Sequence, residues 1–353
     1  MVFILFSILF FGFLIAIHEF GHFITAKLSG VRVNEFSIGM GPRLFGRKRG
    51  ETEYSLRLFP VGGFCAMEGE DEESSDPRSF SKASFGKKVL ILVAGSGMNF
   101  LAGMLILVIL FSGAKAYVST TLDSFMEGCP AAAEGYLMPG DELVKINGSR
   151  VFTHNDISLL LSRNGEETVD LVVKRNGEKI TLEDVPMTLQ EYETEQGSRM
   201  RYGLNFKVQQ SNLMRNVGLA LNSTASFTRS VWLGLLDLIS GAVGLKDMAG
   251  PIGVVGVMTE AGQQAPSVGA GLVNLLYFGA FIAINLAVMN LLPIPALDGG
   301  RLFFLLLNGI TMLLFRRKIP DQYEGYVHMI GLALLMLLML VVGISDIYKL
   351  IAR

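Results

Sequence analysis

Four apolar runs, each long enough to cross a lipid bilayer, constrain this chain more than any other feature of its sequence. They cover residues 2–26, 89–111, 272–292 and 327–345. About 20 apolar residues in a helix cross a hydrocarbon core of roughly 30 Å at 1.5 Å per residue. Only 18% of the residues are charged, against about 25% in a typical soluble domain. The sequence therefore predicts an α-helical polytopic membrane protein with about four transmembrane helices.

Two further apolar stretches are predicted to interact with the membrane without crossing it. Leu302–Phe315 has about two-thirds of the usual spanning length, which favours a partly immersed or re-entrant helix. The segment 211–260 is interrupted by charges such as Arg229 and Asp237. It is predicted to be an amphipathic interfacial segment around Trp232.

The distribution of basic residues predicts the orientation. The loop 27–88 contains eleven Lys and Arg residues, and Arg316-Arg317-Lys318 mark a second basic loop. Both loops are expected to be cytoplasmic, because positive charge collects on that side of membrane proteins. The N-terminus, the region between the second and third spans, and the C-terminus are then expected outside.

The region between the second and third spans is polar and is expected to fold as a soluble domain. Glu142–Ile146 and Thr168–Lys174 alternate as strands do, and a further strand at Lys179–Leu182 follows the Asn176-Gly177 turn. Thr153–Arg163 is predicted to be a short helix. These elements predict an inserted α+β domain.

One run in this region has a specific resemblance. Residues 135–148, GYLMPGDELVKING, resemble PDZ domains of the bacterial protease type. Such domains bind an extended peptide, often a protein terminus, at a sheet edge. An extracytoplasmic PDZ domain with its linker is therefore expected over 116–210, and an unrelated small β domain is the alternative.

Charge and cysteine content exclude several classes of protein. The net charge of −2 excludes a general nucleic-acid binder, which needs a strong basic excess. Two cysteines, Cys65 and Cys129, exclude a disulfide scaffold and a thiolate zinc cluster. They are expected on opposite sides of the membrane, where they cannot pair.

The first span contains the sequence HEFGH at residues 18–22. On a helix, His18 and His22 lie one turn apart on one face, so both imidazoles can reach one Zn²⁺. Glu19 lies beside them, where it can act on water at the metal. Two purely structural histidines are the alternative, but ionisable groups inside a span are costly unless they perform a task. The motif predicts a zinc site within the membrane.

Two histidines and a water leave tetrahedral zinc one protein ligand short. Asp298 is the better remaining candidate, because two prolines in NLLPIPALDGG (290–300) break the helix and free its carboxylate to turn towards the metal. The alternative, that Asp298 merely caps the following helix, stays open. His154 and His328 are expected to be surface or interfacial residues.

Together these motifs resemble the site-2 protease family of intramembrane zinc metalloproteases, nearest to the bacterial regulator-of-sigma-E type with a single PDZ domain. Further matches to the family are FSIGMGP (36–42), FPVGGF (59–64) and DMAGPIG (247–253), so the resemblance covers nearly the whole chain. AGSGMNF (94–100) departs from the pattern where a usual proline is replaced. That departure concerns a local kink in the second span and leaves the metal motifs intact.

The resemblance implies that His18, His22 and Asp298 bind one Zn²⁺, that Glu19 is catalytic, and that Asn290 contacts the substrate or transition state. It implies regulated intramembrane proteolysis, in which peptide bonds within or near transmembrane segments of single-span membrane proteins are hydrolysed. Anti-sigma factors and remnant signal peptides are the expected substrate types. A bacterial inner-membrane location follows, with the active site towards the cytoplasmic side.

A β-hairpin is predicted within the first basic loop. Thr52–Leu58 alternates as a strand does, and Phe36–Gly41 is its expected partner. A helical substrate must become extended to be cut, and the edge of a membrane-dipping hairpin could pair with it. An ordinary cytoplasmic hairpin, without contact to the membrane or substrate, is an equally good interpretation of the same pattern.

Two other classes of function compete with the protease. A non-catalytic PDZ membrane adaptor is disfavoured by the intact Glu19. A zinc protease acting outside the bilayer is disfavoured because HEFGH lies inside a span. The chain is expected to divide into an N-terminal membrane part (1–115), the PDZ domain and linker (116–210), the amphipathic segment (211–260) and a C-terminal membrane part (261–353) that contains the LDG motif (297–299).

Overall fold

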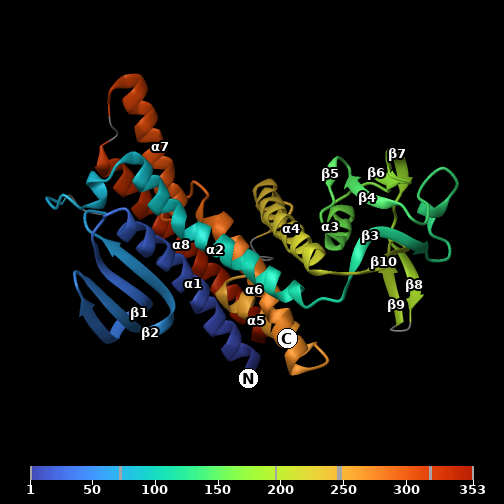
Figure 1. The fold of residues 1–353 in the computed structure, drawn as a ribbon, viewed down its shortest axis with the longest axis horizontal. Helices are drawn as coiled ribbons and strands as arrows, with labels where there is room; N and C mark the ends of the chain where they lie inside the picture. Colours follow the sequence, from blue (N-terminus) through green and yellow to red (C-terminus); the bar gives the residue numbers. More distant parts are fainter. Residues whose placement is uncertain (1, 71–73, 195–196, 245–248, 318–319, 352–353) are drawn as a thin grey trace. The chain divides into compact units, whose positions relative to one another are not determined.

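The fold is described from a computed structural model, which covers residues 2–70, 74–194, 197–244, 249–317 and 320–351 (Figure 1). Asp247 and Met248 of the DMAGPIG motif and Lys318 of the second basic loop lie outside the described residues. The chain forms two compact units. One contains residues 1–107 and 227–353, and the other contains residues 108–226.

In the described part of the chain, five helices are long and apolar enough to cross a membrane, so the protein is a multi-pass membrane protein. They are α1 (Val2–Leu28), α2 (Phe85–Ser112), α6 (Val268–Asn290), α7 (Asp298–Phe315) and α8 (Asp321–Ile351). Four transmembrane helices were predicted from the sequence, and α7 is the fifth candidate. It begins four residues before the predicted start, and its 18 residues span about 27 Å.

Small residues allow the membrane helices of the first unit to approach closely. A Cβ atom on Gly103 of α2 would lie 2.9 Å from the carbonyl oxygen of Ala280 in α6. A Cβ on Gly279 of α6 would lie 2.2 Å from the ring of Phe10 in α1. Close backbone approach of this kind is how membrane helices gain packing contacts without a hydrophobic driving force.

The predicted hairpin is present but longer and bent. It consists of β1 (Val33–Arg49) and β2 (Thr52–Met67), which pair antiparallel. Phe36 lies opposite both Cys65 and Tyr54, so the first part of β1 lies between the two ends of β2. The bends include Gly39 (φ 84°) and Gly62 (φ 96°), conformations that glycine adopts without strain.

The second unit contains the inserted β-rich region, which is consistent with a PDZ-like domain. Its main sheet has the order β10-β3-β4-β6-β7, with β5 paired to β4. The strands are β3 (Ala116–Phe125), β4 (Glu142–Ile146), β5 (Ser149–Arg150), β6 (Thr168–Arg175), β7 (Glu178–Pro186) and β10 (Leu204–Gln210). The short helix α3 (His154–Ser162) matches its prediction, and Thr153 and Asp156 form a capping box at its start. A separate ribbon of β8 (Gln190–Thr194) and β9 (Gly197–Arg201) was not predicted.

The segment predicted to be amphipathic, 211–260, contains two helices instead of one. They are α4 (Leu213–Ser240) and α5 (Pro251–Gln263). Asp346 of α8 is buried and accepts a hydrogen bond of 2.8 Å from the backbone N–H of Gly253, in the first turn of α5. A buried carboxylate therefore supplies the cap that Gly250, the N-cap residue, cannot provide.

Candidate metal centre

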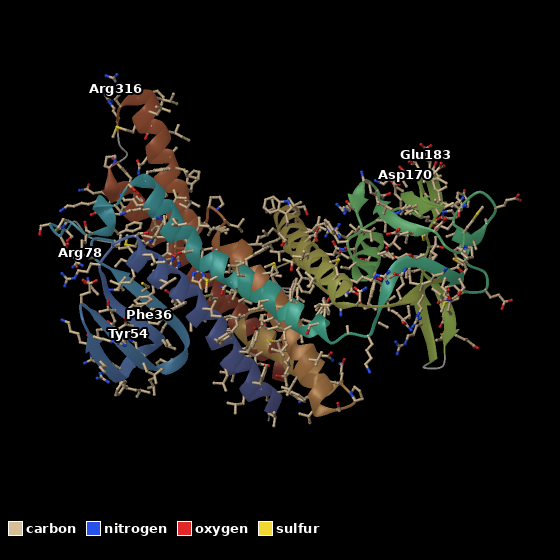
Figure 2. All side chains as sticks on the ribbon, in the orientation of Figure 1. Phe36, Tyr54, Arg78, Asp170, Glu183 and Arg316 are labelled. Carbon is tan, nitrogen blue, oxygen red and sulfur yellow. The ribbon has the colours of Figure 1, made fainter. Side chains whose placement is uncertain are left out.

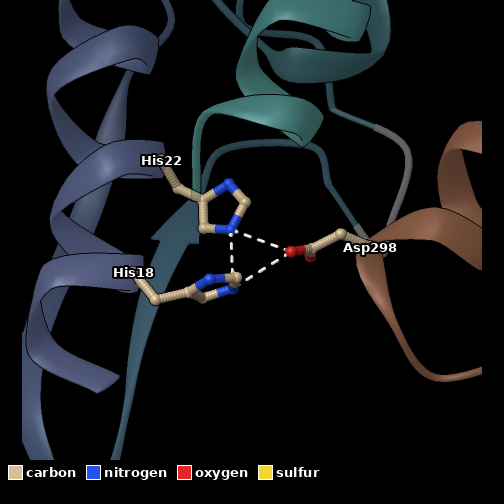
Figure 3. Close-up of side chains that lie close together, drawn as sticks. All are labelled: His18, His22 and Asp298. Atoms are coloured by element: carbon tan, nitrogen blue, oxygen red, sulfur yellow. Dashed lines mark hydrogen bonds and ion pairs between the residues drawn. The ribbon is translucent and has the colours of Figure 1, made fainter. Parts of the chain in front are cut away.

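The two histidines of HEFGH lie on one face of α1, as their spacing predicts. Both are buried, with 9% of His18 and 6% of His22 exposed. Their Nε2 atoms are 3.3 Å apart and point in the same direction (Figure 3). The span therefore presents two imidazole nitrogens to one point inside the protein.

Asp298 completes this group from a distant part of the sequence. Its Oδ2 atom lies 3.0 Å from His18 Nε2 and 3.2 Å from His22 Nε2. Asp298 is the first residue of α7, and the N-cap position belongs to Leu297. This geometry argues against the alternative that Asp298 serves only as the helix cap.

The three atoms fit a metal ion. A tetrahedral zinc ion with ligands at 2.0–2.1 Å separates its ligand atoms by about 3.3 Å, close to the 3.0–3.3 Å between Asp298 Oδ2 and the two Nε2 atoms. Among the His, Cys, Asp and Glu side chains of the described residues, these three come close enough together to hold one metal ion. Asp298 Oδ2 is buried and receives no well-oriented hydrogen bond from a described residue. A carboxylate oxygen that converges with two imidazole nitrogens at these distances is typical of a metal site.

Helix α2 packs against the two histidines and provides a hydrogen-bond partner for one of them. His22 Nδ1 lies 2.9 Å from the backbone carbonyl oxygen of Ile91, so its N–H can donate there and leave Nε2 unprotonated. A Cβ atom on Gly95 would lie 2.2 Å from His22 Nε2 and 2.8 Å from His18 Cε1. Gly95 therefore keeps this space open. Its role was missed because a glycine within an apolar run carries no chemical signature of its own.

Glu19 lies next to the group of His18, His22 and Asp298 and beside the end of β2. Its carboxylate is half-buried and has a hydrogen-bond contact with the backbone of Cys65. A Cβ on Gly63 would lie 3.2 Å from Glu19 Cγ. The end of β2 thus runs directly beside Glu19. Burial, and then the neighbouring Glu19, raise the pKa of the Cys65 thiol far above its usual range, so it stays protonated.

The remaining candidates lie in three different places. Asn290 is half-buried at the end of α6, and its contact with substrate stays a prediction. His154 is in α3, with its ring 4.7 Å from that of Phe206. His328 is half-buried: its side chain is 18% exposed, and its Nδ1 accepts a hydrogen bond of 3.0 Å from the backbone N–H of Ala296. Only the fold, which brings α8 against the turn before α7, could have revealed this contact.

Both cysteines are free and buried. Cys65 belongs to β2, and Cys129 lies between β3 and β4 in the second unit. Neither contributes to the metal group.

Comparison with known proteins identifies the family. The model of peptidase family M50 matches residues 6–338. A protein of Clostridium perfringens that carries the provisional name of a zinc metalloprotease is 37% identical over 348 residues, covering 98% of both chains. The zinc metalloprotease RasP of Geobacillus kaustophilus is 29% identical, covering 96% of both chains. The regulator of sigma-W protease RasP of Bacillus subtilis is 28% identical, covering 97% of both chains. The HEFGH motif, a side-chain group that fits a metal site and a match over nearly the whole length agree, and the chain therefore belongs to peptidase family M50 as a membrane zinc metalloprotease.

Proposed function

We propose that this protein is an intramembrane endopeptidase that holds one Zn²⁺ per chain between His18, His22 and Asp298. The observation that carries the proposal is the convergence of three ligand atoms at 3.0–3.3 Å. The histidines precede Lys27 by nine and five residues on α1, which sets the site roughly 8–14 Å inside the near end of that candidate span. Peptide bonds are then cut within or near transmembrane segments.

The chemistry follows from the neighbours of the site. Zinc, when bound, polarises the scissile carbonyl and lowers the pKa of water towards 7. Glu19 takes the proton from the attacking water and later gives it to the leaving amine. The contact with the Cys65 backbone orients the Glu19 carboxylate for this work. Asn290, at the end of α6, is proposed to contact the substrate or transition state.

The hairpin is proposed to hold the substrate in an extended form. Carbonyl groups in a helix are already hydrogen-bonded, so the substrate must unwind before it is cut. The part of β2 around Gly63 and Cys65 lies beside Glu19. Its backbone can pair with an unwound segment by β-addition and present that segment to the site. This favours a hairpin that dips into the membrane.

The proposed substrates are single-span membrane proteins, cut in regulated intramembrane proteolysis. The name of the Bacillus subtilis relative, a regulator of sigma-W protease, supports anti-sigma factors as one substrate class. Remnant signal peptides are a second class. The PDZ-like domain is proposed to bind peptide or protein termini, and no nucleic acid is expected as a partner.

The proposed layout keeps the four parts 1–115, 116–210, 211–260 and 261–353. The basic loops 27–88 and 316–318 support a cytoplasmic location for both, which sets the metal site towards the cytoplasm and the PDZ-like domain outside a bacterial inner membrane. Cys65 and Cys129 then lie on opposite sides.

Co-expression with tagged single-span substrates tests the function. Wild type should produce a fragment that Glu19→Gln does not, although Glu19→Gln should still bind zinc because its ligands are unchanged. Phe20→Ala serves as a matched control, since Phe20 is the exposed neighbour of Glu19 on α1. A fragment of equal yield from Glu19→Gln would show that Glu19 has no catalytic role.

A further inference from the structure

The β1–β2 hairpin has two faces of opposite character. On one face, charged residues are paired: Arg57 lies 2.8 Å from Glu35, and Arg43 contacts Glu53. The other face forms a groove of about 580 Å³. Its lining is mainly apolar, with two arginines at one end, and consists of Phe36, Ile38, Phe45, Arg47, Arg49, Tyr54, Ser55 and Leu56.

The two arginines of the groove lack acidic partners in the described part of the chain. Arg47 lies opposite Tyr54 in the strand register, and Arg49 lies opposite Thr52. Lys48, between them, points to the other face and lies opposite Glu53. The groove therefore has two uncompensated positive charges beside an apolar floor.

The groove is built on the end of a candidate membrane span. The rings of Phe36 and Tyr54, labelled in Figure 2, lie 5.0 Å and 5.8 Å from that of Phe23, in the last turns of α1. Its apolar side chains are open to the surroundings, with 66% of Phe45 and 48% of Leu56 exposed. An exposed apolar surface at this position adjoins the region where lipid headgroups meet acyl chains.

We propose that this groove binds one anionic phospholipid. Arg47 and Arg49 would hold the phosphate, because guanidinium groups form paired charge-assisted hydrogen bonds with phosphate oxygens. The first part of the acyl chains would lie over Ile38, Phe45 and Leu56. A zwitterionic lipid has a phosphate too, but its ammonium group offsets the attraction to two arginines.

Native mass spectrometry of the full-length protein in detergent, titrated with dioleoylphosphatidylglycerol or dioleoylphosphatidylcholine, tests this site. Wild type should bind its first phosphatidylglycerol more tightly than its first phosphatidylcholine. Arg47→Gln with Arg49→Gln should weaken phosphatidylglycerol binding roughly 30-fold, since each arginine near an anionic lipid contributes about a fivefold factor. Lys48→Gln removes one positive charge from the other face, as each single arginine variant does from the groove, and it should retain wild-type binding.

Two results would overturn the groove as a lipid site. One is equal weakening by Lys48→Gln and by either single arginine variant, which would mean only general charge attraction. The other is wild-type binding that does not distinguish the two lipids. Zinc content identical to wild type verifies that each variant is folded. If the double arginine variant is not folded, the two single arginine variants are measured in its place.

A separate observation concerns the turn before α7. Ala296, two residues before Asp298, has a positive φ of 72°, which is unfavourable for a residue with a side chain. Its backbone N–H donates to His328 Nδ1 at 3.0 Å. The turn is also packed against α8, because a Cβ on Gly331 would lie 2.2 Å from Pro295 Cβ.

We infer that His328 is a positioning residue: by holding the Ala296 turn it fixes the carboxylate of Asp298 for the metal. The inference rests on the proposed role of Asp298 as a ligand. His328 also lies beside the start of α7, since a Cβ on Gly300 would be 3.2 Å from His328 Cε1. Replacing a residue that orients a metal ligand commonly lowers the metal affinity by about 10- to 100-fold.

Replacement of His328 by two amides tests this inference. The amide oxygen of His328→Asn can occupy the position of Nδ1 and accept from Ala296, whereas that of His328→Gln lies near the position of Nε2. Zinc affinity, measured by competition with a chelator, should fall about tenfold or more in His328→Gln and His328→Leu. His328→Asn should restore most of it.

Equal zinc affinity in all three variants, or no difference between His328→Asn and His328→Leu, would overturn the inference. Failure of the proposed function is distinguishable from this outcome. It would appear as unchanged zinc binding in Asp298→Asn, whatever the result at His328.

Discussion

Two aspartates, Asp141 in one unit and Asp298 in the other, have very different surroundings. Asp141 in the PDZ-like domain is fully buried and has complete hydrogen bonding. It accepts from Arg175 Nε and Nη2 at 2.8 Å and from the backbone N–H of Met138 at 2.9 Å. Asp298, at the start of α7, instead has an oxygen that faces two imidazole nitrogens without a well-oriented hydrogen bond. A carboxylate with a full set of hydrogen bonds stabilises its own fold, whereas one that converges with two imidazoles fits a metal site.

The sequence motifs around the two aspartates do not show this contrast. Asp141 and Asp298 each lie next to a glycine, in PGDEL and in LDGG. The local sequence therefore does not distinguish the two roles. The distant partners do, Arg175 in one case and the histidines of α1 in the other.

The largest effect should come from Asp298→Asn. An amide is a much poorer zinc ligand than a carboxylate, so proteolysis should fall by more than about 100-fold while the protein still inserts into the membrane. Zinc content and substrate cleavage in membranes are the measurements. Full activity in this variant would remove Asp298 from the ligand set.

A smaller loss is expected when the space beside the histidines is filled. The methyl group of Gly95→Ala would lie 2.2 Å from His22 Nε2, so zinc binding and activity should drop about tenfold or more. Gly97→Ala is the matched control, because no atom lies within 4 Å of its added Cβ. If both variants bind zinc equally well, α2 does not form a wall of the site.

Asp141→Asn should affect stability and not chemistry. Removing one member of a buried ion pair leaves the other uncompensated, and Arg175 is 20% exposed, so the cost should be about 3 kcal/mol. Limited proteolysis of the full-length protein should show faster cleavage within the PDZ-like domain, at unchanged zinc content. Zinc loss in Asp141→Asn would mean that the two aspartates do not have separate roles.

The smallest effect on chemistry should come from removing the PDZ-like domain altogether. The backbone N–H of Ser211 donates to the carbonyl oxygen of Lys115 at 2.9 Å, so residues 116–210 can be replaced by a short Gly/Ser linker. Cleavage of a substrate already trimmed outside should persist, and substrates with bulky outer domains should gain access. A deleted enzyme that inserts and binds zinc, yet cannot cut the trimmed substrate, would give the domain a direct role.

Features set by short sequence spacing could be predicted. HEFGH places two histidines on one helix face whatever surrounds it, and the PDZ-like run 135–148 contains its own turns. The helix break before Asp298 was predictable from its prolines. These motifs depend on local geometry, so tertiary contacts do not alter them.

Features that depend on contacts between distant segments could not be predicted. The bond between His22 and Ile91, the space kept by Gly95 and the contact of His328 with Ala296 each join different helices. The bends that fold the hairpin back on itself depend on glycines whose φ values the sequence does not specify. The length of α7 was underestimated because its first turn contains Asp298 and Arg301, which interrupt the apolar run.

X-ray absorption spectroscopy at the zinc edge of the purified full-length protein can decide whether His18, His22 and Asp298 hold the metal. One zinc per chain is expected, with nitrogen and oxygen ligands at about 2.0–2.2 Å, two imidazoles and no sulfur. The spectrum should change in Asp298→Asn and remain the same in Asp141→Asn. A sulfur ligand, or a spectrum that is identical in wild type and Asp298→Asn, would contradict the proposed site.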